Sequence, residues 1–236
     1  MSEAAPEPGS PASLTETLWP DPPRTKRGPK PRLTRDEIVA AAAATADTDG
    51  IDAVTMQRVA DTLGTAKMSL YRYVPGKAEL VALALDHTLG DPPALRSDSW
   101  RDRLREWAIA LHGRMRAHPW SLDVTAGTRV PGPHELAWFE EGLRALRATP
   151  LDGSQRLDVL AMLTFHVRGS AQQGSGSARP EAELAELLGP VLATHSDRFP
   201  ETAAAFADPA GRARRDDAFS FGLDRILDGV ATLIAE

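Results

Sequence analysis

The sequence predicts an all-α protein in two parts, with a group of short helices first and longer helices after residue 100. Residues 34–85 contain repeated helix signals, in which a hydroxyl residue opens a segment and a glycine closes it. From Trp100 onward, apolar residues recur at intervals of three and four, which is the period of an amphipathic helix. The 236 residues, 42% of them hydrophobic, are enough to bury a core.

The composition excludes several kinds of site. The chain contains no cysteine, which rules out a disulfide scaffold, a thiol nucleophile and cysteine-ligated metal sites. No stretch approaches the run of about 20 apolar residues that a membrane-spanning helix needs. The first residues are acidic and rich in proline, unlike a secretion signal. We therefore expect a cytoplasmic protein with no membrane segment.

The net charge of −6 hides a local positive segment. Residues 24–35 contain six lysines or arginines and no acidic residue, whereas residues 1–23 contain four acidic residues and no basic one. Residues 1–31 are rich in Pro, Ala, Ser and Glu and have no helical period. We therefore expect residues 1–31 to form a disordered tail with a basic arm.

Capping signals place the first two helices. Thr34 and Glu37 can form a capping box, in which each side chain bonds the backbone N–H of the other residue. Gly50 ends this helix. Thr55 then caps a short second helix, residues 56–63.

The next segment, "TAKMSLYRYVPGK" (residues 65–77), predicts a third short helix over about 66–73. Leu70 and Val74 would then face the core, and Lys77 would start a fourth helix. The side chains left largely outside are those of Lys67, Met68, Ser69, Tyr71, Arg72 and Tyr73.

A short helix, a turn with glycine and a second short helix form the helix-turn-helix pattern, whose second helix fits the major groove of DNA. Hydroxyl and basic groups bind phosphates, and an apolar tip such as Met68 can contact a thymine methyl group. The basic arm, "RTKRGPKPR", is of a type that can follow the DNA backbone or enter a minor groove. The alternative for residues 65–77 is a solvated helix with half-packed tyrosines. The alternative for the basic arm is a solvated run of charged residues.

Residues 34–85 resemble the DNA-binding domain of the TetR (tetracycline repressor) family of transcriptional regulators. The resemblance lies in the order of the helices and in "GIDAVT", "VADTLG" and "SLYRYVPGK". Farther along, "HPW" after the first long helix and "GP" before the next resemble the tetracycline-repressor type of C-terminal domain.

The resemblance implies roles for individual residues in binding double-stranded DNA. Phosphates would be held by Thr55, Ser69, Tyr71, Tyr73 and Lys77, and base edges would be contacted by Gln57, Lys67 and Met68. Arg72 replaces an aromatic or polar residue of the family, so its role stays open. The alternatives are that Thr55 only caps its helix and that Tyr71 belongs mostly to the core.

The sequence of the C-terminal half predicts helices whose apolar surfaces must be covered by other helices. "SQRLDVLAMLTFHV" is apolar nearly all round, so this helix should be buried on two sides. The resemblance implies a homodimer in which two helices of each subunit, here about 154–172 and 215–235, form a four-helix interface. A two-fold dimer would present two reading helices to a palindromic operator.

The resemblance also implies a cavity for a small-molecule effector, apolar or aromatic in character, whose binding moves the fourth helix, 77–89, and releases the operator. The candidate lining residues are Trp107, Leu111, His112, Met115, Trp120, Trp138, Phe139, Met162, Phe165 and His166. The alternative for each is plain core packing.

Two other functions agree less well with the sequence than a repressor does. A helical enzyme would use His166 or His112 as its base, but the sequence contains no phosphate loop, nucleophile elbow or carboxylate pair, so we predict no enzyme. An architectural DNA binder without sequence preference would be basic throughout, and the C-terminal half is acidic. His112, His118, His134 and His166 lack metal-ligand spacing, so we predict no metal and no cofactor. We assign residues 32–78 to DNA binding and residues 79–236 to effector binding and dimerisation.

Overall fold

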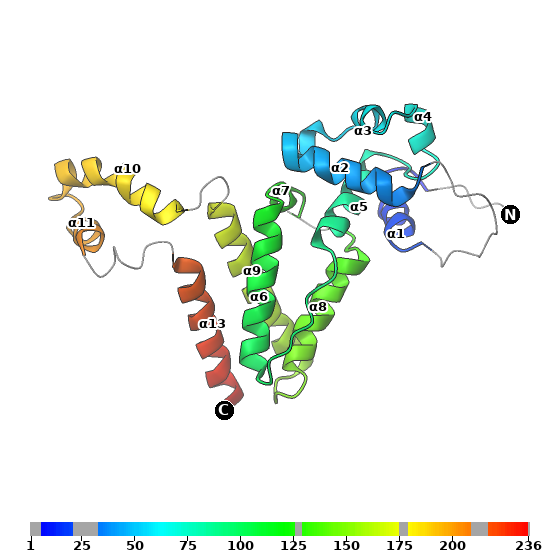
Figure 1. Cartoon of the computed structure of the whole chain (residues 1–236). Helices are drawn as coiled ribbons and strands as arrows, with labels where there is room; N and C mark the ends of the chain where they lie inside the picture. The colour runs from blue at the N-terminus through cyan, green and yellow to red at the C-terminus, as the bar shows by residue number, and fades with distance from the viewer. Residues whose placement is uncertain (1–5, 21–32, 126–128, 175–178, 209–216, 236) are drawn as a thin grey trace. The chain divides into compact units, whose positions relative to one another are not determined.

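The computed structural model describes residues 6–20, 33–125, 129–174, 179–208 and 217–235, and its regular elements in these ranges are helices (Figure 1). The chain forms two compact units, Met1–Arg96 with Gly113–Arg144, and Ser97–His112 with Ala145–Glu236. The elements are α1 (Pro11–Leu18), α2 (Arg35–Asp49), the 3₁₀ turn η1 (Ile51–Ala53), α3 (Met56–Thr62), α4 (Lys67–Leu70), α5 (Lys77–Leu89), α6 (Trp100–Ala117), α7 (Ser121–Val124), α8 (Pro133–Leu146), α9 (Gly153–Gln173), α10 (Pro180–His195), α11 (Pro200–Ala207) and α13 (Ala218–Ala235). The predicted all-α class is confirmed.

Helix α1 corrects the prediction that residues 1–31 are disordered throughout. Ser10 caps this helix by accepting a hydrogen bond from the N–H of Ser13 at 3.2 Å, and Pro11 takes the first helical position, where a missing N–H is tolerated. An eight-residue helix is marginal alone, so its stability comes from packing, here against α5. The basic arm in residues 21–32 lies outside the described residues.

Helix α2 begins with the predicted capping box. The Thr34 hydroxyl accepts a bond from the Glu37 N–H at 3.2 Å, and the Glu37 carboxylate accepts one from the Thr34 N–H at 2.8 Å. The apolar face of α2 is buried through Ile38 and Ala42. Gly50, with φ of 83°, follows the helix in a conformation that favours glycine.

The predicted helix-turn-helix is present in α3 and α4, which pack against each other. Gly64, with φ of 60°, makes the turn between them. Helix α4 is shorter than the 66–73 expected, and the residues after Leu70 continue as turns. Leu70 and Val74 are nonetheless fully buried, as predicted.

Helix α5 occupies the middle of the first unit, where it contacts α1, α2 and α7. Leu80 and Ala84 are fully buried, and two acidic side chains of the same helix, Glu79 and Asp86, are buried as well. Buried carboxylates need hydrogen-bond donors, and the partners of these two connect α5 to other elements.

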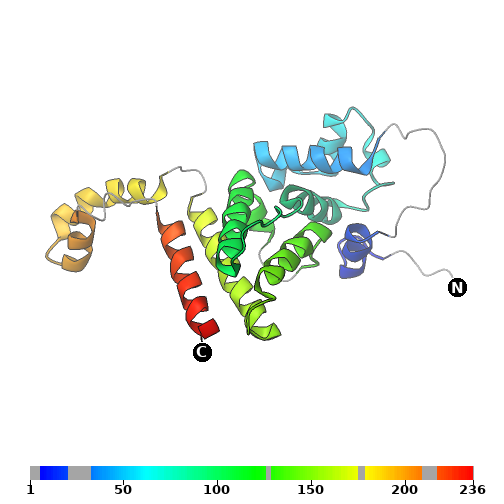
Figure 2. The same cartoon turned by 60° about the horizontal axis from the view of Figure 1, so that its bottom comes forward.

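In the second unit, α9 and α13 run side by side (Figure 2). Helix α6 is joined to α13 by two ion pairs one turn apart, Arg101 with Asp228 and Arg105 with Asp224, both at 2.5 Å. Helices α10 and α11 pack against each other. Among the described helices, none combines the length and the apolar character needed to cross a lipid bilayer.

Candidate nucleic-acid interface and ligand sites

The residues predicted to read DNA form the exposed side of α4 and the turn after it. Met68 is 72% exposed and Tyr71 is 38% exposed, while Leu70 between them is completely buried. Lys67 and Arg72 are also exposed, and Ser69 and Tyr73 are partly so. A helix anchored by one leucine therefore presents basic, hydroxyl and thioether groups to the outside.

Aromatic rings lie close to the basic groups of this surface. The Lys67 ammonium lies 6.0 Å from the centre of the Tyr71 ring, and the Arg72 guanidinium lies 5.7 Å from that of Tyr73. At exposed positions such a contact contributes only about 0.5–1 kcal/mol, so both cations can turn toward a phosphate or a base. Arg72, whose role the sequence left open, thus joins the same surface.

Two predicted residues on the neighbouring helix α3 already have partners. The Thr55 hydroxyl accepts a bond from the Arg58 N–H at 3.1 Å, so Thr55 does cap its helix, and its hydroxyl proton can still be donated to a phosphate. Gln57 is exposed, and its amide donates to Asp61 at 2.7 Å. The amide oxygen and the second amide N–H of Gln57 can still contact adenine, so the bond to Asp61 does not exclude that role. The spacing of four residues within a helix was the sequence signal for the Asp61 contact.

Lys77 is exposed at the first position of α5. Its ammonium lies 3.4 Å from the backbone carbonyl of Asp52, which belongs to η1. This lysine therefore connects η1, which precedes the helix-turn-helix, to α5, which follows it. Its ammonium can also reach a phosphate.

The ten predicted effector residues fall in both compact units. Met115, Trp120, Trp138 and Phe139 belong to the first unit, and Trp107, Leu111, His112, Met162, Phe165 and His166 belong to the second. Trp107 and Leu111 are buried, whereas Met162 is 42% and Phe165 is 72% exposed. The last two therefore lie on the surface of the single chain.

Two of the tryptophans connect helices through hydrogen bonds of their indole N–H groups. The indole N–H of Trp120 donates to the Asp47 carboxylate at 2.7 Å, which connects α7 to α2. The indole N–H of Trp138 donates to the carbonyl of Gly90 at 3.0 Å, which connects α8 to the end of α5. Buried tryptophans usually find such partners.

In the second unit, His112 and His166 meet on the ring of Phe219, which is not among the predicted effector residues. The Phe219 ring stacks on His112 at 4.0 Å and lies 5.5 Å from His166, and the His166 Nε2 donates to the Phe219 carbonyl at 2.8 Å. A Cβ on Gly222 would overlap the His166 ring, so this glycine is a sequence signal for the close approach of α13 to α9. Since a carbonyl only accepts, His166 Nε2 carries a proton and cannot act as a base there.

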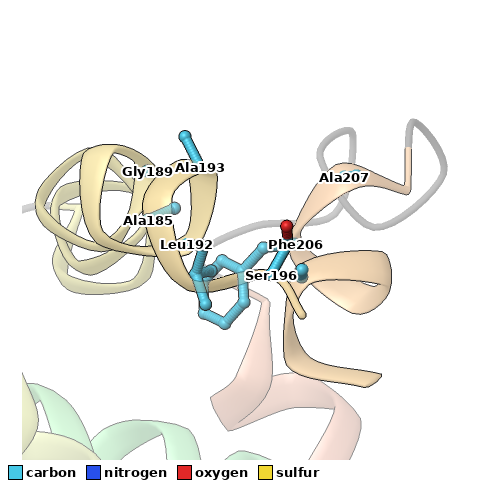
Figure 3. Close-up of a pocket in the computed structure, with 8 residues that line it drawn as sticks. Ala185, Gly189, Leu192, Ala193, Ser196, Phe206 and Ala207 are labelled. Carbon is cyan, nitrogen blue, oxygen red and sulfur yellow. The ribbon is translucent and has the colours of Figure 1, made fainter. Parts of the chain in front are cut away.

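The structure has a cavity of about 470 Å³ between α10 and α11. Figure 3 shows Leu192 and Phe206 in the space between these helices, among alanines and one serine. None of the predicted effector residues lines this cavity. Within the described residues, no group of three or more His, Asp or Glu side chains is arranged to hold a metal ion.

A helix-turn-helix with an exposed basic and hydroxyl surface, followed by helices in the described part of the C-terminal half, is the arrangement of a DNA-binding transcriptional regulator. The profile of the tetR family of bacterial regulatory proteins matches residues 38–84, and that of the tetracycline-repressor-like C-terminal domain matches residues 92–234. The chain belongs to the TetR family.

Similar proteins agree with this assignment. The chain is 37% identical to the HTH-type transcriptional repressor DrrR1 of Streptomyces coeruleorubidus, over 97% of this chain and 88% of that protein. It is 27% identical to the class A tetracycline repressor of Escherichia coli, over 85% and 91% of the two chains. Among solved structures, the Streptomyces coelicolor TetR family protein ActR in complex with (S)-DNPA covers 86% of this chain and 98% of its own, with a TM-score of 0.71 and 27% identity. ActR in complex with actinorhodin gives a TM-score of 0.72 at 25% identity, over 87% and 98% of the two chains.

Proposed function

We propose that this regulator is a homodimeric repressor that binds a palindromic operator through α4 and leaves it when a small molecule binds the C-terminal half. The observation that carries the proposal is the outward side of α4, where Lys67, Met68 and Tyr71 are exposed around a fully buried Leu70. On this proposal, residues 32–78 bind DNA and residues 79–236 bind the effector and the second subunit.

The contacts divide by chemistry. Thr55, Ser69, Tyr71, Tyr73 and Lys77 offer hydroxyl and ammonium groups suited to phosphates, which position the protein without reading sequence. Gln57, Lys67 and Met68 offer an amide, an ammonium and an apolar tip suited to adenine, guanine and the thymine methyl group. Arg72 adds a further cation.

Dimerisation is supported by an apolar surface on α9 and α13. Its large exposed side chains are Leu157, Met162, Phe165, Phe221 and Leu233. A monomeric protein rarely exposes so many apolar groups on two adjacent helices, and a two-fold partner would cover them. On this reading Met162 and Phe165 contact the partner subunit rather than the effector.

The predicted residues of the second unit other than Met162 and Phe165 support an apolar or aromatic effector. His112, His166 and Phe219 form a stack of rings in the second unit, and His112 follows the buried Trp107 and Leu111 on α6. Stacked rings with a few polar points suit an aromatic ligand. The relative ActR, solved with two different ligands, supports effector binding in this family.

The test is selection of binding sites from random duplex DNA with the purified chain. The proposal expects a palindrome whose half-sites are centred about 34–36 Å apart, one helical turn, and two chains bound per duplex. A library that yields no common sequence would contradict the proposal in favour of binding without sequence preference. Compounds that raise the melting temperature can then be screened for release of the selected site.

A further inference from the structure

A second cavity lies in the first compact unit, beneath helix α1. Its volume is about 580 Å³, within the range of about 300–1,000 Å³ that is usual for small-molecule sites. Its walls come from α1, from α5, from Val124 at the end of α7 and from Arg129 and Val130 before α8. The lining residues are Leu14, Lys77, Ala78, Val81, Ala82, Leu85, Val124, Arg129 and Val130.

The hollow results from small side chains on one side of α5. Ala78 and Ala82 lie one turn apart on the side toward α1, whereas Leu80 and Ala84 are fully buried in the core. Larger residues at 78 and 82 would fill the space between the helices. The lining is apolar except for Lys77 and Arg129, as ligand sites with a few polar points are.

Hydrogen bonds fix the walls of this cavity. The Glu79 carboxylate accepts bonds from the Gly9 N–H at 2.6 Å and the Ser13 hydroxyl at 2.5 Å, which hold α1 on α5. At the other end of α1, the Trp19 indole donates to the Pro131 carbonyl at 3.0 Å. The three walls are therefore joined to one another, and a ligand would enter a preformed site with little ordering cost.

The two cations of the lining differ in their pairing. Arg129 is joined to the Glu135 carboxylate at 2.5 Å, so its charge is neutralised. The Lys77 ammonium has no carboxylate partner in the described ranges, and the atom it contacts is the Asp52 carbonyl, 3.4 Å away. Lys77 lines the apolar cavity, and its flexible side chain can bring one positive charge to a ligand with one acidic group.

We propose that this cavity binds an apolar small molecule that carries a single carboxylate, with the apolar part between α1 and α5 and the carboxylate on Lys77. The site goes beyond the effector binding proposed above, because none of the effector candidates lines it. It shares Lys77 alone with the proposed DNA contacts.

The test uses decanoate and its uncharged counterpart decanamide as probes, with the full-length protein, in the absence of DNA. Isothermal titration should show saturable binding of decanoate, and Ala82→Met should weaken it by about tenfold or more because the added side chain fills the space. Ala117→Met, at an exposed alanine of α6 outside the cavity, should leave binding unchanged. Lys77→Gln should remove the preference for decanoate over decanamide.

Val130→Phe fills the same space from the opposite wall, so the test stands if Ala82→Met does not fold. Unchanged decanoate affinity in either folded variant would show that the probe binds elsewhere and would overturn the site. No saturable binding of decanoate to the unsubstituted protein would overturn the proposed ligand class. Since no measurement uses an operator, failure here leaves the DNA-binding proposal untouched, and the reverse also holds.

Discussion

Asp86 on α5 and His134 at the start of α8 are joined by two hydrogen bonds. One Asp86 oxygen accepts from the His134 N–H at 3.0 Å, and the other contacts the His134 Nδ1 at 2.8 Å. The N–H of Glu135 reaches the first oxygen at 3.2 Å. A buried carboxylate of α5 therefore caps α8, and a Cβ on Gly132 would overlap that carboxylate, which explains the glycine of the "GP" pair.

Asp86→Ala should lower the free energy of unfolding by about 2 kcal/mol, because it leaves the first N–H groups of α8 without an acceptor. Urea denaturation followed by circular dichroism measures this. Asp91→Ala is the matched control: Asp91 is exposed and lies 3.6 Å from the same histidine, so its loss should cost less than about 0.5 kcal/mol. Equal effects of the two substitutions would contradict the capping role.

Substitutions at two nearby residues of α4 should affect different properties, one the stability of the fold and the other the binding of DNA. Leu70→Ala should cost about 2–5 kcal/mol of stability, because Leu70 is fully buried. Met68→Ala should change stability by less than about 0.5 kcal/mol, because Met68 is exposed, and should weaken binding to the selected operator. A large loss of stability in Met68→Ala would place Met68 in the core instead.

The attachment of α1 should depend on pH through Glu79. Burial alone would raise the pKa of Glu79, but hydrogen bonds from Ser13 and Gly9 hold this pKa below its ordinary value of 4.5. Because the folded-state pKa is the lower one, the stability from Glu79 is present above about pH 4.5 and is lost as the pH falls through the folded-state value.

Urea unfolding of the unsubstituted protein and of Glu79→Gln at several pH values measures this dependence. The difference in free energy of unfolding should be largest near neutral pH and should shrink on acidification. A difference that grows as the pH falls would contradict the direction of the pKa shift.

The proposed dimer surface can be tested at its most exposed ring. Phe165→Asp should convert the dimer to monomer at micromolar concentration, because a charge would be buried without a partner in an apolar interface. Sedimentation velocity measures the change. Leu136→Asp, on the exposed side of α8, is the control and should remain dimeric. Dissociation by both variants, or by neither, would argue against α9 as the interface.

Local signals predicted the N-terminal helices well. The Thr34 capping box, the buried Leu70 and Val74 and the exposed Met68 all depend on residues within a few positions of one another, which the sequence displays directly. Helix α1 could not be predicted in this way, because the Glu79 carboxylate that holds it is about seventy residues away in the chain.

The residues proposed for the effector site were harder to predict for the same reason. Phe219 joins His112 and His166 from a helix far along the chain, and a ring at helical spacing looks the same whether it fills a core or lines a cavity. Phe165 also belongs to an apolar period, yet it lies exposed, because a single chain leaves bare the face that we expect a partner to cover.

The central claim, that α4 reads base sequence, is tested most directly by Lys67→Ala in gel-shift titrations on the selected operator and on its single-base variants. We predict that Lys67→Ala weakens operator binding and lowers discrimination at one base position by about 1–3 kcal/mol, whereas Lys77→Ala weakens binding to all sequences alike. Arg147→Ala, exposed after α8, should change neither quantity. Unchanged affinity and unchanged base preference in Lys67→Ala would contradict the assignment of α4 as the reading helix.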